Sequence, residues 1–436
     1  MKHTRTRWLA ACGVAAAASI AVAGCSPGGS GSGSAGTTGS SAGSGGTYAV
    51  TAGVLHAFTG QNAFFGLNAQ VACKAAAVQI NAAGGIMGHP LACSAYDTKG
   101  DPADAVPVAN RMLVSAPHLV MVVGPDGGDI PSVLPLLEQS KAPEMNTVGD
   151  PRYDTQTSQY FWRLTPSDST QAPALAYAAY HLGYTRIVEV FTSDLSAQTT
   201  TAPFQASYTK LGGTILKQLT IAPDQSSYQT EVAAALATHP QAIVGEMDAR
   251  TSATFLSELR QQHGSLIPFV VTQRALQGDW AAAVVPALGG ATVSRYVTTI
   301  APVLQSAGAA FKAFQSAMTA AKANPFQVKN PFVAAGYDGV IAFALAMDAA
   351  KSTDGSVFVT YIPKVTAPGS GVTVVNTYAQ GVAALKAGKT IQYVGAAGPM
   401  VFNRYNTANR PYAEWTYNAT AHSWVMGQAL PQNAGQ

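Results

Sequence analysis

The sequence predicts an α/β protein with two doubly wound, three-layer lobes. Helical and strand patterns alternate along most of the chain, which is typical of sheets built from β-α-β units. The run Leu119 to Val123 is apolar without alternation, as expected for a parallel strand that is covered on both faces. With 436 residues, the chain is long enough for two such domains.

The first unit can be followed element by element. A Gly-punctuated loop over 58–66 leads into a helix that is apolar over much of its circumference and is closed by Gly84 and Gly85. We expect this helix to pack on a sheet. Residues 90–97 alternate in polarity and predict a strand. The next helix opens with Asp101 as N-cap and a proline at its first helical position, and a buried strand completes the unit.

The rest of the chain repeats the same pattern. Further helices are predicted over 130–140, 170–182, 200–211, 227–238 and 250–263. Further strands are predicted over 143–148, 186–191, 213–219, 242–246 and 267–272. The second half therefore forms another three-layer sheet. Three later helices, over 306–322, 334–350 and 378–387, have no sheet of comparable size of their own.

The N-terminus has the form of a bacterial lipoprotein signal. Basic residues are followed by an apolar stretch over 8–23, and Val22-Ala23-Gly24-Cys25 resembles a lipobox. We expect residues 1–24 to be removed and Cys25 to carry lipid. Several acyl chains at Cys25 would hold the protein on a membrane. The alternative is a retained transmembrane helix, which a short, Ala-rich run disfavours. Residues 25–46 predict a flexible Gly/Ser tether.

Two cysteines remain after Cys12 in the signal and Cys25 at the lipid site are set aside. Cys73 lies on the first helix and Cys93 on the second strand, and we expect these two elements to contact each other. A protein outside the reducing cytosol can keep a disulfide. We expect a structural disulfide between them, the alternative being two free buried thiols.

Composition and motifs exclude several function classes. Removing three of the 25 Lys and Arg residues with the signal leaves 22, which equals the 22 Asp and Glu, and no basic cluster points to nucleic acid. No metal-binding or dinucleotide spacing appears, and Gly388-Lys389-Thr390 lacks the earlier glycine of a P-loop. We therefore expect no cofactor and no metal. An enzyme would need a set of catalytic residues that come together only in the fold, because the spacing of residues along the sequence does not show one.

Several short segments, each weak alone, form a specific combination in this order. They are Phe58-Thr59-Gly60-Gln61-Asn62 through Phe65-Gly66, INAAGGIMGHPL at 80–91, DTKGDPADAVPVANRML at 97–113, Phe161-Trp162-Arg163, Pro166-Ser167-Asp168, Leu182 to Ile187, and Gly336-Tyr337-Asp338-Gly339. Together they resemble the periplasmic leucine/isoleucine/valine-binding proteins, which are type I solute-binding receptors of ABC importers. The resemblance covers nearly all of residues 47–428.

The resemblance implies a Venus-flytrap fold with a three-strand hinge. The expected parts are lobe 1 over 47–165 and 300–397, and lobe 2 over 166–299 and 398–436. The three late helices would then return to lobe 1. Two such lobes close on a ligand that lies between the carboxyl ends of their strands.

The loop before the predicted helix at 130–140 is the first candidate contact. In the family this loop holds a ligand carboxylate with help from a Ser that is not evident here. Gly127 and Gly128 would let backbone N–H groups face the cleft at a helix N-terminus. Asp126 would repel a carboxylate if it faces the cleft, so the ligand is cationic, neutral or anchored differently. Asp129 is expected to be a plain N-cap.

A second contact loop aligns with Asn146-Thr147-Val148-Gly149. The family usually places a hydroxyl where Gly149 falls, whereas Thr147 offers one two residues earlier. Thr147 either contacts ligand, beside Val148, or caps the turn. Phe65 takes the place of an aromatic residue that covers the ligand side chain, and its alternative is packing against Phe64.

Gln61 and Asn62 come from the first loop and would either hydrogen-bond the ligand or stabilise the turn. Tyr337 would line the cleft, or pack beside it. Its neighbour Asp338 is expected to cap a helix or tie the hinge.

In lobe 2, Glu246 and Asp248 follow a buried strand, where the family commonly places an acidic residue for the ligand ammonium. A carboxylate in a closed cleft attracts a cation strongly, and the alternative is a solvated loop charge. Gln198 falls near a usual Tyr-Gly position that is absent here, which departs from branched-chain specificity.

The expected function is that of a monomeric, lipid-anchored extracytoplasmic receptor. It would bind a small polar metabolite, an amino acid or a relative, and deliver it to an ABC permease in the membrane without making or breaking a bond. The alternatives are a sensor lipoprotein of the same fold and, less favoured, a surface enzyme.

Overall fold

The computed structural model describes most of the chain from Tyr48 onward, and these residues form one compact unit. The described residues are 48–60, 63–305, 307–431 and 434. The predictions that lie outside them are the signal peptide, the lipid site at Cys25, the tether, and the contacts of Gln61 and Asn62.

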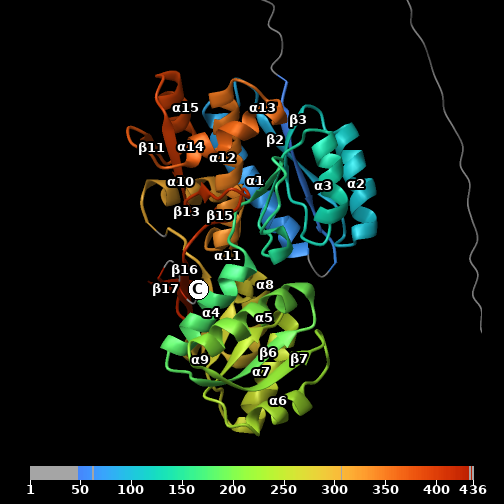
Figure 1. Cartoon of the computed structure of the whole chain (residues 1–436), viewed down its shortest axis with the longest axis vertical. Coiled ribbons are helices and arrows are strands. Elements are labelled where there is room, and N and C mark those ends of the chain that lie inside the picture. Colours follow the sequence, from blue (N-terminus) through green and yellow to red (C-terminus); the bar gives the residue numbers. More distant parts are fainter. Residues whose placement is uncertain (1–47, 61–62, 306, 432–433, 435–436) are drawn as a thin grey trace, which may run out of the picture. The chain divides into compact units, whose positions relative to one another are not determined.

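Lobe 1 is built on a parallel five-stranded sheet in the order β2-β1-β3-β4-β5 (Figure 1). Its strands are β1 Val50–His56, β2 Leu91–Asp97, β3 Leu119–Val123, β4 Glu144–Asn146 and β5 Phe161–Arg163. Its first helices are α1 Ala63–Ala82, α2 Pro102–Ser115 and α3 Ile130–Gln139. Helices α2 and α3 cover one face of the sheet and α1 covers the other, so the predicted three layers are confirmed.

The local signals in lobe 1 act as expected. Gly84 and Gly85 follow α1 with positive φ angles, a conformation that glycine adopts without strain. The Asp101 side chain accepts the N–H of Ala103 and caps α2. Cys73 on α1 and Cys93 on β2 form a disulfide with 6.1 Å between their Cα atoms, which confirms the predicted pairing.

The three predicted late helices are present and pack on α1 of lobe 1. They are α10 Ala309–Ala320, α12 Pro331–Ala350 and α15 Tyr378–Lys386. Three short helices that the sequence did not predict lie between them, α11 Pro325–Val328, α13 Gly355–Phe358 and α14 Ile362–Thr366. A small sheet of β11 Thr373–Val375, β12 Ile391–Gly395 and β13 Gly398–Pro399 lies with them. Helix α12 packs on α1 and is long and apolar enough to cross a membrane, but most of it is buried in the core.

Lobe 2 is built on a seven-stranded sheet in the order β17-β16-β10-β9-β8-β6-β7. Its strands are β6 Arg186–Thr192, β7 Thr214–Ile221, β8 Ala242–Glu246, β9 Phe269–Thr272, β10 Val297–Pro302, β16 Tyr412–Asn418 and β17 Ser423–Ala429. Its helices are α4 Asp168–His181, α5 Leu195–Lys210, α6 Gln229–Leu236, α7 Ala249–His263, α8 Gly278–Leu288 and α9 Gly290–Tyr296.

Alternation along β6 shows why this lobe has three layers. Ile187 and Phe191 join the core under α4 and α5, whereas Val188 and Val190 join the core on the opposite face. Successive side chains of a strand point to opposite faces, so a strand with buried apolar residues on both faces needs cover on both. The first five strands are parallel, and β16 and β17 are antiparallel additions at one edge.

The hinge comprises three crossings, after β5, after β10 and before β16. Arg163 on the first crossing donates from Nε to Thr407 Oγ1 (3.1 Å), and Arg410 on the third donates from Nε to the Leu164 carbonyl (3.1 Å). Asp338 accepts the N–H groups of Ala396 (2.9 Å) and Ala397 (2.7 Å), so it ties the turn between β12 and β13 to α12.

The chain joins the second sheet later than expected. Between β13 and β16 lies a ribbon of β14 Val401–Phe402 and β15 Ala408–Asn409, which bridges to Arg163 beside lobe 1. The strand that enters lobe 2 begins at Tyr412, beyond the expected boundary at 398. Two-residue strands carry too little pattern for the sequence to reveal the ribbon.

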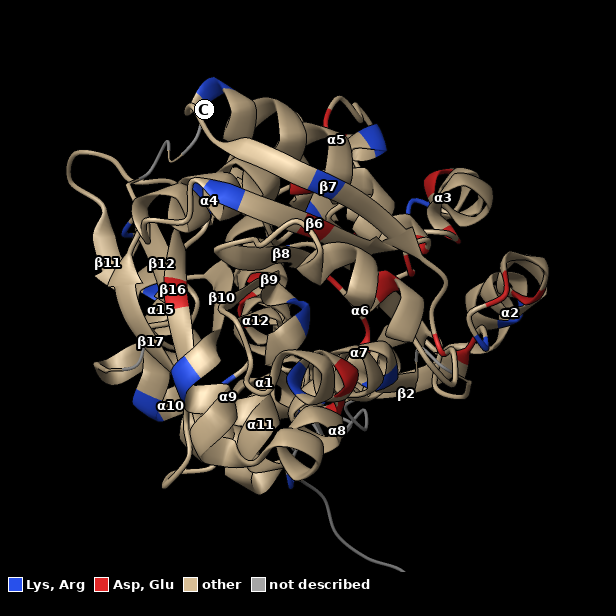
Figure 2. Cartoon of the chain, turned by 90° about the horizontal axis from the view of Figure 1, so that it is seen from below, with Lys and Arg blue, Asp and Glu red and all other residues tan. Residues whose placement is uncertain are grey.

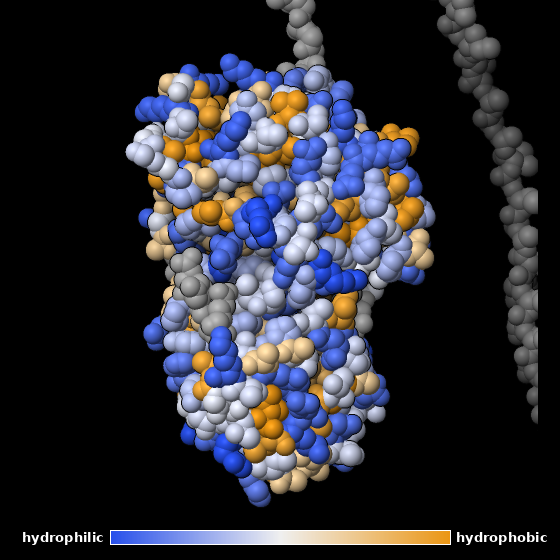
Figure 3. All heavy atoms as spheres, viewed as in Figure 1, coloured by the Kyte–Doolittle hydropathy of each residue, from blue (hydrophilic) through white to orange (hydrophobic). Residues whose placement is uncertain are grey.

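Charged and apolar residues are dispersed over the surface. Lys and Arg positions are spread over several helices and strands (Figure 2), and apolar residues form small separate patches on the face shown in Figure 3. Isolated apolar residues of this kind are normal for a folded surface.

Candidate ligand-binding cleft

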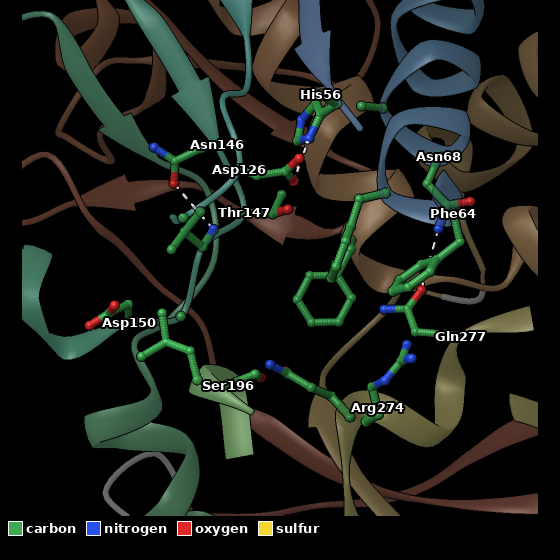
Figure 4. A pocket seen from close by; sticks show the side chains of 18 of the residues that line it. His56, Phe64, Asn68, Asp126, Asn146, Thr147, Asp150, Ser196, Arg274 and Gln277 are labelled. Atoms are coloured by element: carbon green, nitrogen blue, oxygen red, sulfur yellow. Dashed lines mark hydrogen bonds and ion pairs between the residues drawn. The ribbon is translucent and has the colours of Figure 1, made fainter. Parts of the chain in front are cut away.

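A cavity of about 380 Å³ lies where the carboxyl ends of the strands of both sheets meet. Lobe 1 contributes the end of β1, the loops after β3 and β4, and parts of α1 and α12, and lobe 2 contributes the ends of β6, β8 and β9. In Figure 4, His56, Asp126 and Thr147 face Ser196 and Arg274 across an open space. This volume fits a small metabolite, and the carboxyl edge of a doubly wound sheet is where such folds bind ligands.

Most of the predicted ligand-binding residues line this cavity. They are Phe65, Asp126, Gly127, Gly128, Thr147, Val148, Glu246 and Asp248. Within the described part of the chain, Gln198 and Tyr337 are not among the lining residues.

Gln198 and Tyr337 are corrections. Gln198 Nε2 donates to the Thr192 carbonyl (2.8 Å), which turns this side chain toward its own sheet. Tyr337 is 2% exposed, and its ring packs 5.1 Å from that of Phe314 between ring centroids. Other residues of the same two helices, such as Ser196 and Gly336, face the cavity instead. The prediction chose the right helices but the wrong faces.

Asp126 reaches the cavity with both carboxylate oxygens already bound. Oδ1 lies 2.8 Å from Nδ1 of His56, and Oδ2 accepts the Ala57 N–H at 2.9 Å. Burial alone would raise the pKa of Asp126, but the charge and hydrogen bond of His56 and the Ala57 amide outweigh it and lower the pKa. Asp126 is therefore an ionised partner of His56, which the sequence did not reveal.

Asp129 does not cap α3 as expected. Its backbone is already helical, at φ −87° and ψ −24°, and its side chain makes no capping hydrogen bond. The residue is 1% exposed, and burial, then the charge of Asp126, raises the pKa of Asp129 to about 6. Among the described residues, no hydrogen bond uses the N–H of Gly127 or Gly128, so both amides remain available beside the cavity.

The loop after β4 is held by a relay of side chains behind it. Val148 N–H donates to Asn146 Oδ1 (3.2 Å), and Asn146 Nδ2 donates to Glu144 Oε2 (3.1 Å). Burial raises the pKa of Glu144 well above its ordinary value, although the bond from Asn146 opposes this. The Val148 amide is therefore occupied. The Thr147 hydroxyl has no hydrogen-bond partner within the described part of the chain and lines the cavity.

Gly149 has no room for the hydroxyl-bearing side chain that the family places there. An added Cβ would overlap the carboxylate of Asp168, whose N–H donates to the Gly149 carbonyl (2.7 Å). Burial and then the charge of Glu246 raise the pKa of Asp168 to about 7, against the hydrogen bond from Thr199. Asp168 lines the cavity and was not predicted to do so.

Glu246 is held by hydroxyl groups. Ser196 Oγ donates to Oε1 and Thr272 Oγ1 donates to Oε2, each at 2.7 Å. Burial raises the pKa of Glu246, with the hydroxyl bonds and the charge of Arg274 opposing it. Asp248 also lines the cavity, but it caps α7 by accepting the N–H groups of Arg250 and Thr251 at 3.0 Å. Glu246 is therefore the better placed of the two for a ligand cation.

Arg274 is a further cavity residue that the sequence did not reveal. It follows β9, and its guanidinium carbon lies 4.5 Å from the ring centroid of Phe64 in lobe 1. Nη2 pairs with Asp279 Oδ2 at 3.3 Å. The Phe64 and Phe65 rings are 4.1 Å apart, and Phe65 lines the cavity while 38% exposed. Phe65 therefore packs against Phe64 and also faces the cavity, and its contact with a ligand stays a prediction.

The sequence profile of the periplasmic binding protein family matches residues 49–418. The chain belongs to the periplasmic binding protein family. No curated protein matches this binding protein in a sequence search. The resemblance in the N-terminal signature, the hinge and the lobes is thereby confirmed at the level of family and type I fold.

Solved structures with the same fold include three that differ in ligand. A leucine binding protein from Thermotoga maritima superposes with a TM-score of 0.68 at 18% identity, covering 87% of this chain and 98% of its own. A branched-chain amino acid transporter substrate binding protein from Streptococcus pneumoniae, in complex with isoleucine, gives 0.68 at 19%, covering 87% and 100%. A solute binding protein from R. palustris, in complex with benzoate, gives 0.69 at 15%, covering 88% and 98%.

The binding protein's lobes already touch at one side of the cleft. Gln277 in lobe 2 accepts from Asn68 Nδ2 on α1 at 3.3 Å (Figure 4). It also accepts from Asn330 Nδ2 at the start of α12 at 3.0 Å. Within the described part of the chain, no group of three or more His, Cys, Asp or Glu side chains is placed to hold a metal ion.

Proposed function

We propose that this protein is the lipid-anchored substrate-binding protein of an ABC importer, and that it captures an amino acid or a related small polar metabolite by hinge closure. The observation that carries the proposal is the cavity itself. Its wall is shared between two lobes and combines buried carboxylates, aromatic rings and backbone amides of Gly127 and Gly128 that have no partner among the described residues. Each lobe alone would offer only half of a site.

Closure gives the binding its selectivity. A ligand that contacts lobe 1 in the open form gains the contacts of lobe 2 only when the hinge closes. It shifts the equilibrium toward the closed form by its difference in affinity for the two states. The closed form then presents surfaces of both lobes to a permease, and no bond of the ligand is changed.

The ligand carries a cationic group, because buried carboxylates gather on the lobe 2 side. Glu246 and Asp168 both line the cavity and are close enough for the charge of Glu246 to act on Asp168. An ammonium ion between them would relieve this repulsion in a place where solvent screens poorly. The isoleucine of the S. pneumoniae structure is a ligand of this kind, which supports an amino acid here as well.

The N-terminal signal supports the lipid anchor. Cys25 in the lipobox would carry the lipid, and residues 26–46 would let a monomeric receptor reach a permease from the membrane surface. Metabolic labelling with a radioactive fatty acid, compared between wild type and Cys25→Ala, tests this part separately. Incorporation that persists in Cys25→Ala would contradict it.

Thermal unfolding tests the binding function. The chain without signal and lipid, residues 26–436, is heated with a panel of amino acids, amides, polyamines and small carboxylates. A ligand at a hundredfold excess over its Kd should add about 2.7 kcal/mol of stability and raise the midpoint. The shift should be confined to one chemical class and be lost in Glu246→Ala. Folded protein whose midpoint no compound raises would contradict the proposal.

A further inference from the structure

The two walls of the cavity differ in polarity. Lobe 1 supplies most of its apolar lining, including Phe65, Val123, Met145, Leu164, Phe332 and Val333. The described lining from lobe 2 is mainly charged or hydroxyl-bearing, and Leu195 and Pro223 are its apolar members. A ligand with one charged end and one apolar end would match this division by placing its charged end in lobe 2.

Lobe 1 also offers fewer hydrogen-bond donors to a ligand carboxylate than the family resemblance of its loops predicts. The Val148 amide is bound to Asn146, and Gly149 cannot carry a hydroxyl because Asp168 occupies the space. The ionised Asp126 lies beside the free amides of Gly127 and Gly128 and would repel an anion there.

Arg274 supplies what lobe 1 lacks. Among the described residues that line the cavity, it is the only lysine or arginine. Its Nη1 is buried and makes no hydrogen bond within the described part of the chain, while Nη2 is paired with Asp279. A buried guanidinium nitrogen without an acceptor is costly, and a carboxylate is the acceptor that fits it best. The charge of Arg274 also acts on Glu246, so the two groups belong to one cluster.

We propose that Arg274 binds the carboxylate of an amino acid ligand, which places the charged head of the ligand in lobe 2 and its side chain in lobe 1. Its carboxylate binds Arg274, its ammonium lies between Glu246 and Asp168, and its side chain packs against Phe65 and the apolar wall of lobe 1. This inference rests on the proposed function. It assigns Arg274 as the residue that selects for a carboxylate.

Matched compounds separate the two charges of the head. Isothermal titration uses L-phenylalanine, phenethylamine and 3-phenylpropanoate, and a second series uses L-leucine, 3-methylbutylamine and 4-methylpentanoate. In wild type the amino acid should bind best in at least one series. Arg274→Gln should weaken the amino acid and the acid by about tenfold or more and leave the amine within about twofold. Glu246→Gln should weaken the amino acid and the amine but not the acid.

Two surface variants provide matched controls for the loss of charge. Arg250→Gln removes an exposed arginine from lobe 2, and Glu138→Gln removes an exposed carboxylate from lobe 1. Neither residue lines the cavity, so both variants should bind all six compounds as wild type does. Unfolding in urea checks that Arg274→Gln and Glu246→Gln are folded.

Two results would overturn the inference and leave the proposed function intact. The first is amino acid binding that Arg274→Gln leaves unchanged and Thr147→Val weakens, which would place the head in lobe 1 and reduce Arg274 to a partner of Phe64 and Asp279. The second is binding of a polyamine or amide in place of all six compounds. Failure of the whole panel, in folded protein, contradicts the proposed function instead.

Discussion

The carboxylate of Asp168 occupies the space that any side chain at Gly149 would need. Gly149 lies in the loop after β4 and Asp168 is the first residue of α4, and they are joined by the bond from the Asp168 N–H to the Gly149 carbonyl. The missing hydroxyl at position 149 is therefore the counterpart of an acidic residue at position 168. A change at one site constrains the other.

This pairing predicts a coupled double-mutant cycle. Gly149→Ala should destabilise the protein by about 1–3 kcal/mol, because Cβ displaces a buried carboxylate. The same change should cost much less in an Asp168→Ala background, where the space is open. Urea unfolding of the four proteins measures the coupling. Additive costs would show that the two residues do not compete for space.

Ligand affinity should depend on pH through Asp168. Its pKa is raised to about 7, so this carboxyl group is mostly neutral at pH 6 and mostly ionised at pH 8. An ammonium ligand favours the ionised form, and affinity should fall as pH falls below 7, by at most about tenfold per pH unit. Titration calorimetry from pH 6 to pH 8 measures it, with Asp168→Asn as the variant whose profile should be flat. An equal slope in that variant would assign the dependence to another group.

Stability should depend on pH through Glu189 on β6. This residue is 2% exposed, accepts a bond from Gln205, and has Oε2 unpartnered among the described residues. Burial, opposed by the Gln205 bond, raises the pKa of Glu189 to about 7. The folded state then keeps a proton that the unfolded state loses at lower pH. The contribution of this group is complete below its unfolded pKa, and it is lost as pH rises through about 7.

Glu189→Gln removes that dependence. The variant should match wild type near pH 4 and become more stable than wild type at pH 8, by up to about 3 kcal/mol. Urea unfolding at the two pH values gives the difference, and the exposed Glu138→Gln serves as control. A variant less stable than wild type at pH 8 would show that ionised Glu189 has a partner that stabilises it.

The Cys73–Cys93 disulfide should stabilise the fold without shaping the site. Its cysteines are 20 residues apart, and closing a loop of that length in the unfolded chain is worth about 3 kcal/mol. Replacing both cysteines with alanine should lower the free energy of unfolding by roughly this amount. Ligand affinity should stay within about twofold, because neither cysteine lines the cavity. A large loss of affinity in folded protein would contradict this separation.

The sequence predicted the architecture well because strands and caps carry local signals. The apolar run of β3 and the Asp101 cap of α2 lie where their patterns placed them. When every face of a helix is buried, it is harder to predict which of its faces points toward the cavity. Tyr337 and Gly336 both lie on α12, whose residues from Val333 to Met347 are all buried, so polarity could not show which one faces the cavity.

The cavity residues that could not be predicted from the sequence owe their roles to contacts with residues that are distant in the sequence. His56 matters because Asp126, 70 positions later, meets it. Arg274 matters because a ring from the other lobe lies over it. His56 is the last residue of β1 and Arg274 follows β9, and that position at the carboxyl edge of a sheet was the available signal. The spacing of residues along the sequence does not reveal such long-range contacts.

Arg163 and Arg410 join the first and third crossings by side-chain bonds. Crossings tied to each other in this way cannot bend one at a time. We therefore expect the two lobes to rotate about a single hinge axis rather than to slide or twist against each other. Arg274 and the apolar wall opposite would then approach along the same path in every cycle of capture and release.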